Sequence, residues 1–144
     1  MQRILIILTA LSIGVAVVWL GYKTLPEDNV EVINGHIGVS ALLVDFGDID
    51  QDGGIVSTTV EVSNTGEGVL EIHRLSTSCG CTTAQMNESP LSAGEARTLT
   101  IEFDPMAHPD QSGPITRVIY IQSSDPGQPE LEIDITGNVI PKIL

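Results

Sequence analysis

From residue 41 onward, hydrophobic and polar residues alternate with a period of two in several short segments. Such alternation is typical of half-buried β-strands, and clusters of turn-forming residues separate the segments. In residues 96–104, for example, Leu99, Ile101 and Phe103 are predicted to point inward and the polar residues between them outward. The expected strands are residues 41–47, 55–64, 68–76, 96–104, 115–124 and 130–140. Six or seven short strands without a helical period predict an antiparallel β-sandwich.

The N-terminal part of the chain has a different pattern. Residues 4–22 are 19 consecutive residues without a charged side chain. A helix of this length covers about 28 Å, close to the ~30 Å hydrocarbon core of a bilayer. Trp19 and Tyr22 lie together near one end, where amphipathic aromatic side chains favour the membrane interface. A cleaved signal peptide is the alternative, but the run ends in VVWLGYK rather than in the small residues of a cleavage site.

The charges beside the apolar run predict its orientation. Arg3 and the amino terminus precede the run and Lys23 follows it, so the positive-inside rule leans towards a cytoplasmic N-terminus. The rest of the chain would then face the periplasm or the cell exterior, with the anchor in the bacterial inner membrane. That compartment is oxidising, and paired thiols there tend to form disulfides. The predicted organisation is a transmembrane anchor helix at 1–23, a linker at 24–37 and one domain at 38–144.

The part of the chain beyond the anchor is strongly acidic. All 19 Asp and Glu residues lie at or after Glu27, whereas only four basic residues follow Lys23, which gives this part a net charge of −15. Such a charge argues against binding to nucleic acid, because proteins bind nucleic acid through basic patches. It also argues against a domain that lies flat on anionic lipid. Because the acidic residues are scattered, solubility explains them, with attraction to cationic partners as the alternative.

The stretch TSCGCTTA, residues 77–84, contains the only two cysteines of the chain, Cys79 and Cys81. If a strand continued through them, both side chains would share one face, with Cα atoms about 6.6–7.2 Å apart. A disulfide prefers about 4.4–6.8 Å, so the bond would require the chain to bend at Gly80, where glycine bends at low cost. A disulfide that closes so small a loop should stabilise the fold little. A structural role for the pair, oxidised or not, stays open.

A bound soft metal is the competing interpretation of the two cysteines. Two thiolates on one face suit Cu(I), with a Met or His as third ligand, whereas the ligand spacing typical of zinc sites is absent. Met106 and His108 lie in a turn-rich loop between two expected strands. The candidate metal ligands are therefore Cys79, Cys81, His108 and Met106, although a simple exposed loop also explains the last two. Thiol–disulfide exchange is a third interpretation, for which Arg74 is the nearest basic residue in the sequence.

Several segments together resemble one bacterial domain family of unknown function, which is marked by an S-C-G-C-T motif. The segments are VDFGDI, VEVSNTGEGVLEI, SCGCTTA, LSAGEARTLTIEFDP and SDPGQPELEIDITGNV. The SCGCT motif makes the resemblance specific, because the other segments are shared widely among sandwich domains. The resemblance covers residues 41–140 and implies a single immunoglobulin-like antiparallel β-sandwich of about seven strands, akin to the PapD and major sperm protein folds. It implies a secreted or membrane-attached protein and no particular activity.

The sequence contains no convincing set of catalytic residues, since it lacks a G-x-S-x-G elbow and a recognisable carboxylate pair. We therefore expect a non-enzymatic, membrane-anchored binding or accessory subunit without a cofactor. Its partners would be other membrane or periplasmic subunits of a larger complex, for which a respiratory or photosynthetic complex is one plausible host. The alternative function is a membrane-tethered copper-handling protein that binds Cu(I) through the Cys-Gly-Cys motif.

Overall fold

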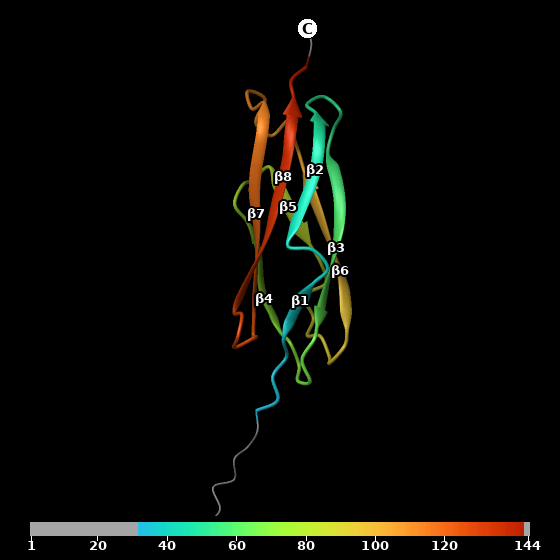
Figure 1. The fold of residues 1–144 in the computed structure, drawn as a ribbon, viewed down its shortest axis with the longest axis vertical. Coiled ribbons are helices and arrows are strands. Elements are labelled where there is room, and N and C mark those ends of the chain that lie inside the picture. The colour runs from blue at the N-terminus through green and yellow to red at the C-terminus, as the bar shows by residue number, and fades with distance from the viewer. Residues whose placement is uncertain (1–31, 143–144) are drawn as a thin grey trace, which may run out of the picture. The chain divides into compact units, whose positions relative to one another are not determined.

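The alternating hydrophobic positions become the inward faces of eight strands in the computed structural model, which describes residues 32–142 (Figure 1). The strands are β1 (Ile37–Val39), β2 (Leu43–Asp50), β3 (Val56–Asn64), β4 (Ile72–Thr77), β5 (Thr82–Gln85), β6 (Ala96–Phe103), β7 (Gly113–Ser123) and β8 (Glu130–Ile140). They form two four-stranded sheets. The strand order is β1-β3-β6-β5 in the first sheet and β2-β8-β7-β4 in the second. The described residues are thus all-β, and the predicted sandwich is confirmed for them.

One strand pair departs from the predicted antiparallel arrangement. β2 runs parallel to β8, with Leu43 opposite Asp134, whereas the other pairs are antiparallel. The cause lies in the connection between β1 and β2. Figure 1 shows β2 continuing in the direction of β1 after the chain crosses from the first sheet to the second. The direction of β8 is set separately by its antiparallel pairing with β7, so β2 meets β8 in parallel.

Several element boundaries differ from those expected. The strand predicted at residues 68–76 begins only at Ile72, because Leu70 instead forms an isolated bridge with Leu91. The strand β5 was not predicted, and β1 begins at Ile37, one residue before the expected start of the domain. Within the described residues there is no helix that is long and apolar enough to cross a membrane. The predicted anchor at 1–23 lies outside the described residues.

The hydrophobic core lies between the two sheets. Leu99, Ile101 and Phe103 of β6 point inward as predicted, and each is at most 1% exposed. Alternate residues of β8 are buried in the same way: Leu131, Ile133 and Ile135. Full burial of a side chain of this size stabilises a fold by about 1.5–3 kcal/mol. The apolar faces of the strands therefore supply most of the driving force for the sandwich.

A second, smaller core cluster lies where β2 and β8 finish. Its buried members are Ile49, Cys81, Phe103, Ile115 and Val139. Cys79 is partly buried and packs against the same cluster. The cysteines are thus attached to the core at one end of the sandwich.

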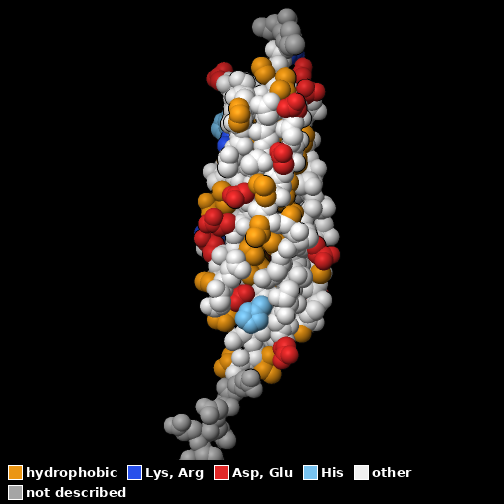
Figure 2. Space-filling view, viewed as in Figure 1, with side chains coloured by type: hydrophobic (Ala, Val, Ile, Leu, Met, Phe, Trp, Pro, Cys, Tyr) orange, Lys and Arg blue, Asp and Glu red, His pale blue; other side chains and the backbone are white. Residues whose placement is uncertain are grey.

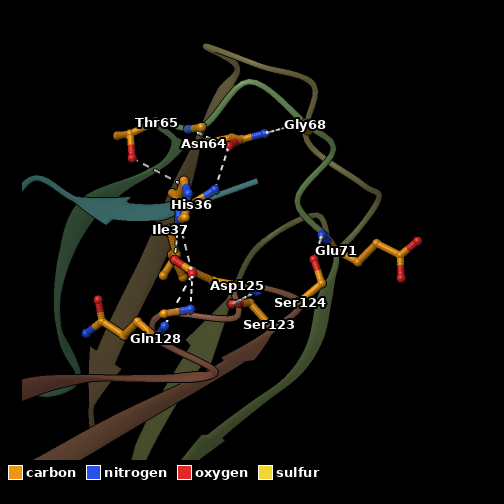
Figure 3. A network of polar contacts seen from close by, with 12 residues as sticks. His36, Ile37, Asn64, Thr65, Gly68, Glu71, Ser123, Ser124, Asp125 and Gln128 are labelled. Atoms are coloured by element: carbon orange, nitrogen blue, oxygen red, sulfur yellow. Dashed lines mark hydrogen bonds and ion pairs between the residues drawn. The ribbon is translucent and has the colours of Figure 1, made fainter. Parts of the chain in front are cut away.

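Asp125, in the turn between β7 and β8, ties the first residues of the sandwich to the second sheet (Figure 3). Its carboxylate accepts hydrogen bonds from the backbone N–H groups of Ile37 at 2.9 Å, Gly127 at 2.8 Å and Gln128 at 3.2 Å, and lies 3.1 Å from His36 Nδ1. Burial raises the pKa of Asp125, but the hydrogen bonds from Ile37, Gly127, His36 and Gln128 outweigh it, so the pKa is lower than usual. The charged carboxylate is therefore part of the folded state.

The surface carries acidic side chains at several separate places on the face drawn in Figure 2, with hydrophobic side chains between them. This scattered distribution agrees with the scattered acidic residues of the sequence. It is the arrangement expected of charges that keep a domain soluble.

A candidate thiol and soft-metal site

The two cysteines occupy the crossing between the sheets. β4 is the edge strand of the second sheet and β5 is the edge strand of the first, and only residues 78–81 connect them. A hydrogen bond from the N–H of Thr82 to the carbonyl of Cys79, 3.1 Å long, closes this connection into a tight turn. The hydroxyl of Thr77 lies 3.0 Å from the carbonyl oxygens of both Cys79 and Thr82, and its hydrogen bonding to them stabilises the turn.

This turn joins Cys79 and Cys81 in a disulfide, with Cα atoms 5.2 Å apart. An extended strand would hold the two Cα atoms too far apart, and the turn removes that obstacle. Gly80 is not among the glycines with positive φ, and a Cβ built on it would meet no atom of any residue beyond its two chain neighbours within 4 Å. The chain therefore bends at Gly80 as the disulfide requires, but through a turn that residues other than glycine can also adopt.

The two sulfur atoms lie in different surroundings. Cys81 is 3% exposed and belongs to the smaller core cluster. Cys79 is only partly buried, and its Sγ accepts a 3.2 Å hydrogen bond from the N–H of Cys81. A solvent-borne reagent therefore meets the sulfur of Cys79 before that of Cys81.

Arg117, on β7, places a positive charge against the buried sulfur. Its Nε donates to the Sγ of Cys81 at 3.2 Å. The rest of the guanidinium is held by the side-chain oxygen of Gln111 and the carbonyl of Thr116, each at 2.7 Å. Guanidinium groups stay charged under all ordinary conditions and donate in a fixed geometry. Arg117 is thus positioned to stabilise a thiolate on Cys81.

Arg74 is the basic residue nearest to the cysteines in the sequence, but Arg117, which the sequence did not indicate, is the one that contacts Cys81. Arg74 is exposed on β4, opposite Gln122 of β7. Arg117 reaches the cysteines because β7 pairs with β4, and the backbone N–H of Ser78 continues this pairing to the carbonyl of Val118 at 2.9 Å. Only the strand register brings these residues together, and the sequence carries no local signal for that register.

His108, in the loop between β6 and β7, approaches the more accessible sulfur. Its Nε2 lies 3.5 Å from the Sγ of Cys79. The loop is attached to the cysteine turn where it begins, since the N–H of Asp104 donates to the carbonyl of Cys81 at 2.9 Å. The ligand atoms of Cys79, Cys81 and His108 all lie within 4.8 Å of one another.

The other candidate residues lie elsewhere or stay predictions. Met106 is on the same loop as His108, and its side chain is 49% exposed. Its role as a metal ligand stays a prediction. His73 is exposed on β4. His36, expected in the linker, instead contacts Asp125 at the start of the sandwich.

Two kinds of chemistry are open to this arrangement. In the disulfide form, neither sulfur is a thiolate. The pair is then a poor metal ligand, but its S–S bond can be attacked by the thiolate of a partner. In the dithiol form, two sulfurs and an imidazole converge, which is a donor set suited to Cu(I). The oxidation state of the pair therefore decides which chemistry the site can support.

Comparison with known families finds a match that covers nearly the whole of the described sandwich. Residues 37–139, from the start of β1 almost to the end of β8, match a family described as "Protein of unknown function (DUF1573)". The chain belongs to the DUF1573 family. No curated protein matches the chain.

Solved structures with the same fold come from bacteria and from human. A protein of unknown function from Porphyromonas gingivalis W83 has a TM-score of 0.66 at 24% identity, over 76% of this chain and 51% of that one. PapD-like domain 7 of human CEP192 has a TM-score of 0.60 at 13% identity, over 83% and 95%. The VesB protease of Vibrio cholerae has a TM-score of 0.58 at 13% identity, over 71% and 31%. At these identities the similarity shows the fold alone, which is a PapD-like sandwich.

Proposed function

We propose that this DUF1573 chain is a non-enzymatic binding or accessory subunit of a larger bacterial membrane complex. Residues 4–22 would anchor it in the inner membrane with the N-terminus in the cytoplasm. The sandwich would then stand in the periplasm or outside the cell, at the end of the linker at 24–37. Its partners would be other membrane or periplasmic proteins, with a respiratory or photosynthetic complex as one possible host.

The observation that carries this proposal is an open sheet edge with exposed hydrophobic side chains. Among the described residues 32–142, β2 is the last strand of the second sheet, with β8 on one side only. Leu42 and Leu43, where β2 begins, are each 59% exposed. An extended segment of another protein can add to such an edge through main-chain hydrogen bonds, while apolar side chains supply contact area. The irregular register between Asp45 and Asp48 interrupts the edge further along, which confines the regular part to its start.

The test is purification of the full chain from its native membrane in mild detergent. We expect at least one membrane or periplasmic protein to co-purify. Leu43→Asp should remove that protein, because the charge would be placed at the proposed contact. Val69→Asp is the matched control, since Val69 is 58% exposed but lies outside the strands of this edge. A chain that purifies only as a monomer, or two variants that behave alike, would count against the proposal.

Copper handling is the second candidate, favoured by the convergence of Cys79, Cys81 and His108. Because the two sulfurs are bonded to each other, Cu(I) would be bound only after the pair is reduced. The three residues would hold the ion, and Met106 stays a predicted further ligand. The predicted state is therefore a copper-free disulfide that becomes a ligand set on reduction.

Anaerobic titration of the reduced full chain with Cu(I) tests this candidate. We expect about one Cu(I) per chain, as a single two-thiolate site predicts. The double variant Cys79→Ser, Cys81→Ser should lose this binding and His108→Ala should weaken it. His73→Ala, which changes an exposed histidine on β4, should have no effect. Unchanged binding in the double variant would eliminate the site.

A further inference from the structure

We infer that the Cys79–Cys81 bond is a reactive disulfide that accepts two electrons from a dithiol, with Cys79 as the attacked sulfur and Cys81 as the leaving sulfur. This inference goes beyond both the accessory role and copper binding, and it does not depend on either. It rests on the unequal surroundings of the two sulfurs and on the positions of Arg117 and His108.

Access decides which sulfur is attacked. Cys81 is 3% exposed and packed among core residues, whereas Cys79 is partly exposed. Gly80, between them, is exposed, and even an added Cβ there would meet no atom of any residue beyond its two chain neighbours within 4 Å. An incoming thiolate can therefore approach along the open side of the turn and reach the Sγ of Cys79. Thiol–disulfide exchange begins with such an attack by a thiolate on one sulfur of the bond.

In the first step, the incoming sulfur forms a bond to the Sγ of Cys79. The bond between Cys79 and Cys81 breaks, and its electron pair stays on the Sγ of Cys81 as a thiolate. The Nε–H of Arg117 already points at this sulfur from 3.2 Å. Gln111 and Thr116 hold the guanidinium in place, so its charge is present before the thiolate forms. A better-stabilised leaving thiolate departs faster.

In the second step, the other thiolate of the dithiol attacks its own partner sulfur in the mixed disulfide. The dithiol closes into a disulfide, and Cys79 is released as a thiolate. His108 Nε2, 3.5 Å from this sulfur, is placed to give it a proton or a hydrogen bond. In total the dithiol loses two electrons, and its two thiol protons pass to solvent as it ionises. The cysteine pair gains the two electrons, and the two product thiolates take up two protons from solvent.

The inference predicts how variants of the full chain react with dithiothreitol as the dithiol. Arg117→Gln should slow reduction of the disulfide about tenfold, because a cation beside the leaving sulfur is lost. Arg117→Lys should recover part of the rate by restoring the charge. Arg97→Gln is the matched control, because Arg97 forms an ion pair with Glu95 and not with either cysteine. The disulfide of this variant should be reduced at the same rate as that of the unchanged protein.

A second pair of variants tests the direction of attack. With one cysteine replaced, glutathione disulfide should modify Cys79 in the Cys81→Ser variant much faster than Cys81 in the Cys79→Ser variant. If Arg117→Gln does not fold, Gln111→Ala removes one support of the guanidinium and should slow reduction to a smaller extent. Equal rates in unchanged protein, Arg117→Gln and Arg97→Gln would overturn the inference, as would equal or faster modification of Cys81.

Discussion

The Nε of Arg117 lies 3.2 Å from the Sγ of Cys81, although the two residues are 36 positions apart in the chain. They meet because β4 and β7 are neighbours in the second sheet, with Thr77 opposite Ile119. The cysteine turn follows directly after β4, so it is carried alongside the part of β7 that bears Arg117. One sulfur is thereby buried beside a cation, while the other stays partly exposed beside His108.

Reduction of the Cys79–Cys81 bond should destabilise the fold only slightly. A cross-link between residues two positions apart removes little entropy from the unfolded chain, and we expect a loss of about 1–2 kcal/mol. Denaturant unfolding of the oxidised and reduced chain measures this difference. In the Cys79→Ser, Cys81→Ser double variant, reductant should change nothing. A loss above about 4 kcal/mol on reduction would make the pair primarily a structural staple.

Gly80→Ala should fold normally. Gly80 has no positive φ and its α-carbon faces open space, so alanine fits and should change the free energy of unfolding by less than about 1 kcal/mol, in the stabilising direction. Gly68→Ala is the control, because a Cβ at Gly68 would collide with the backbone of Ile33, and it should be clearly destabilising. Thermal unfolding measures the stability of both variants. An equal loss of stability in Gly80→Ala and Gly68→Ala would disprove this account of the turn.

Asp125→Asn should destabilise the sandwich by roughly 1–3 kcal/mol, because the amide has one acceptor oxygen where the carboxylate has two, and one buried N–H loses its partner. The carboxylate oxygens divide these bonds, since Oδ2 accepts from Ile37 and Oδ1 from Gly127. Asp134→Asn, on the exposed side of β8, should change stability by less than about 0.5 kcal/mol. Denaturant unfolding of both variants provides the comparison.

The same carboxylate predicts a pH dependence of stability. Burial raises the pKa of Asp125, but its hydrogen bonds lower the pKa by more, so the folded-state pKa lies below the unfolded value of about 3.9. The contribution of Asp125 is therefore complete above about pH 5 and decreases as the pH falls through 3.9 towards the lower folded value. The stability difference between the unchanged chain and Asp125→Asn should shrink over this interval. A difference that stays constant down to about pH 2 would contradict the assignment.

The sandwich could be predicted because its strands alternate clearly. Leu99, Ile101 and Phe103 are buried as the period-two pattern requires. β5 was missed because its four residues, Thr82–Gln85, follow the cysteine turn directly and are too few to show a pattern. The parallel pairing of β2 with β8 could not be predicted either, because it depends on the chain changing sheets between β1 and β2.

The candidate site was predictable only in part. Met106 and His108 were named as candidate ligands by residue type alone, with an exposed loop as the alternative, and the structure places His108 beside Cys79. Arg117 was not found, because its position depends on the register of β7 against β4. Asp125 and His36 were missed for the same reason, since their contact joins residues 89 positions apart. Long-range contacts of this kind have no local sequence signal.

The reduction potential of the Cys79–Cys81 pair tests the central claim of a reactive disulfide most directly. It can be measured on the full chain by equilibration with dithiothreitol or glutathione redox buffers, followed by counting of free thiols by mass. Because Arg117 stabilises the thiolate form, the account predicts a potential well above the value of about −300 mV below which structural disulfides lie. A potential at or below about −300 mV would contradict the account and leave the pair as a structural feature of the sheet crossing.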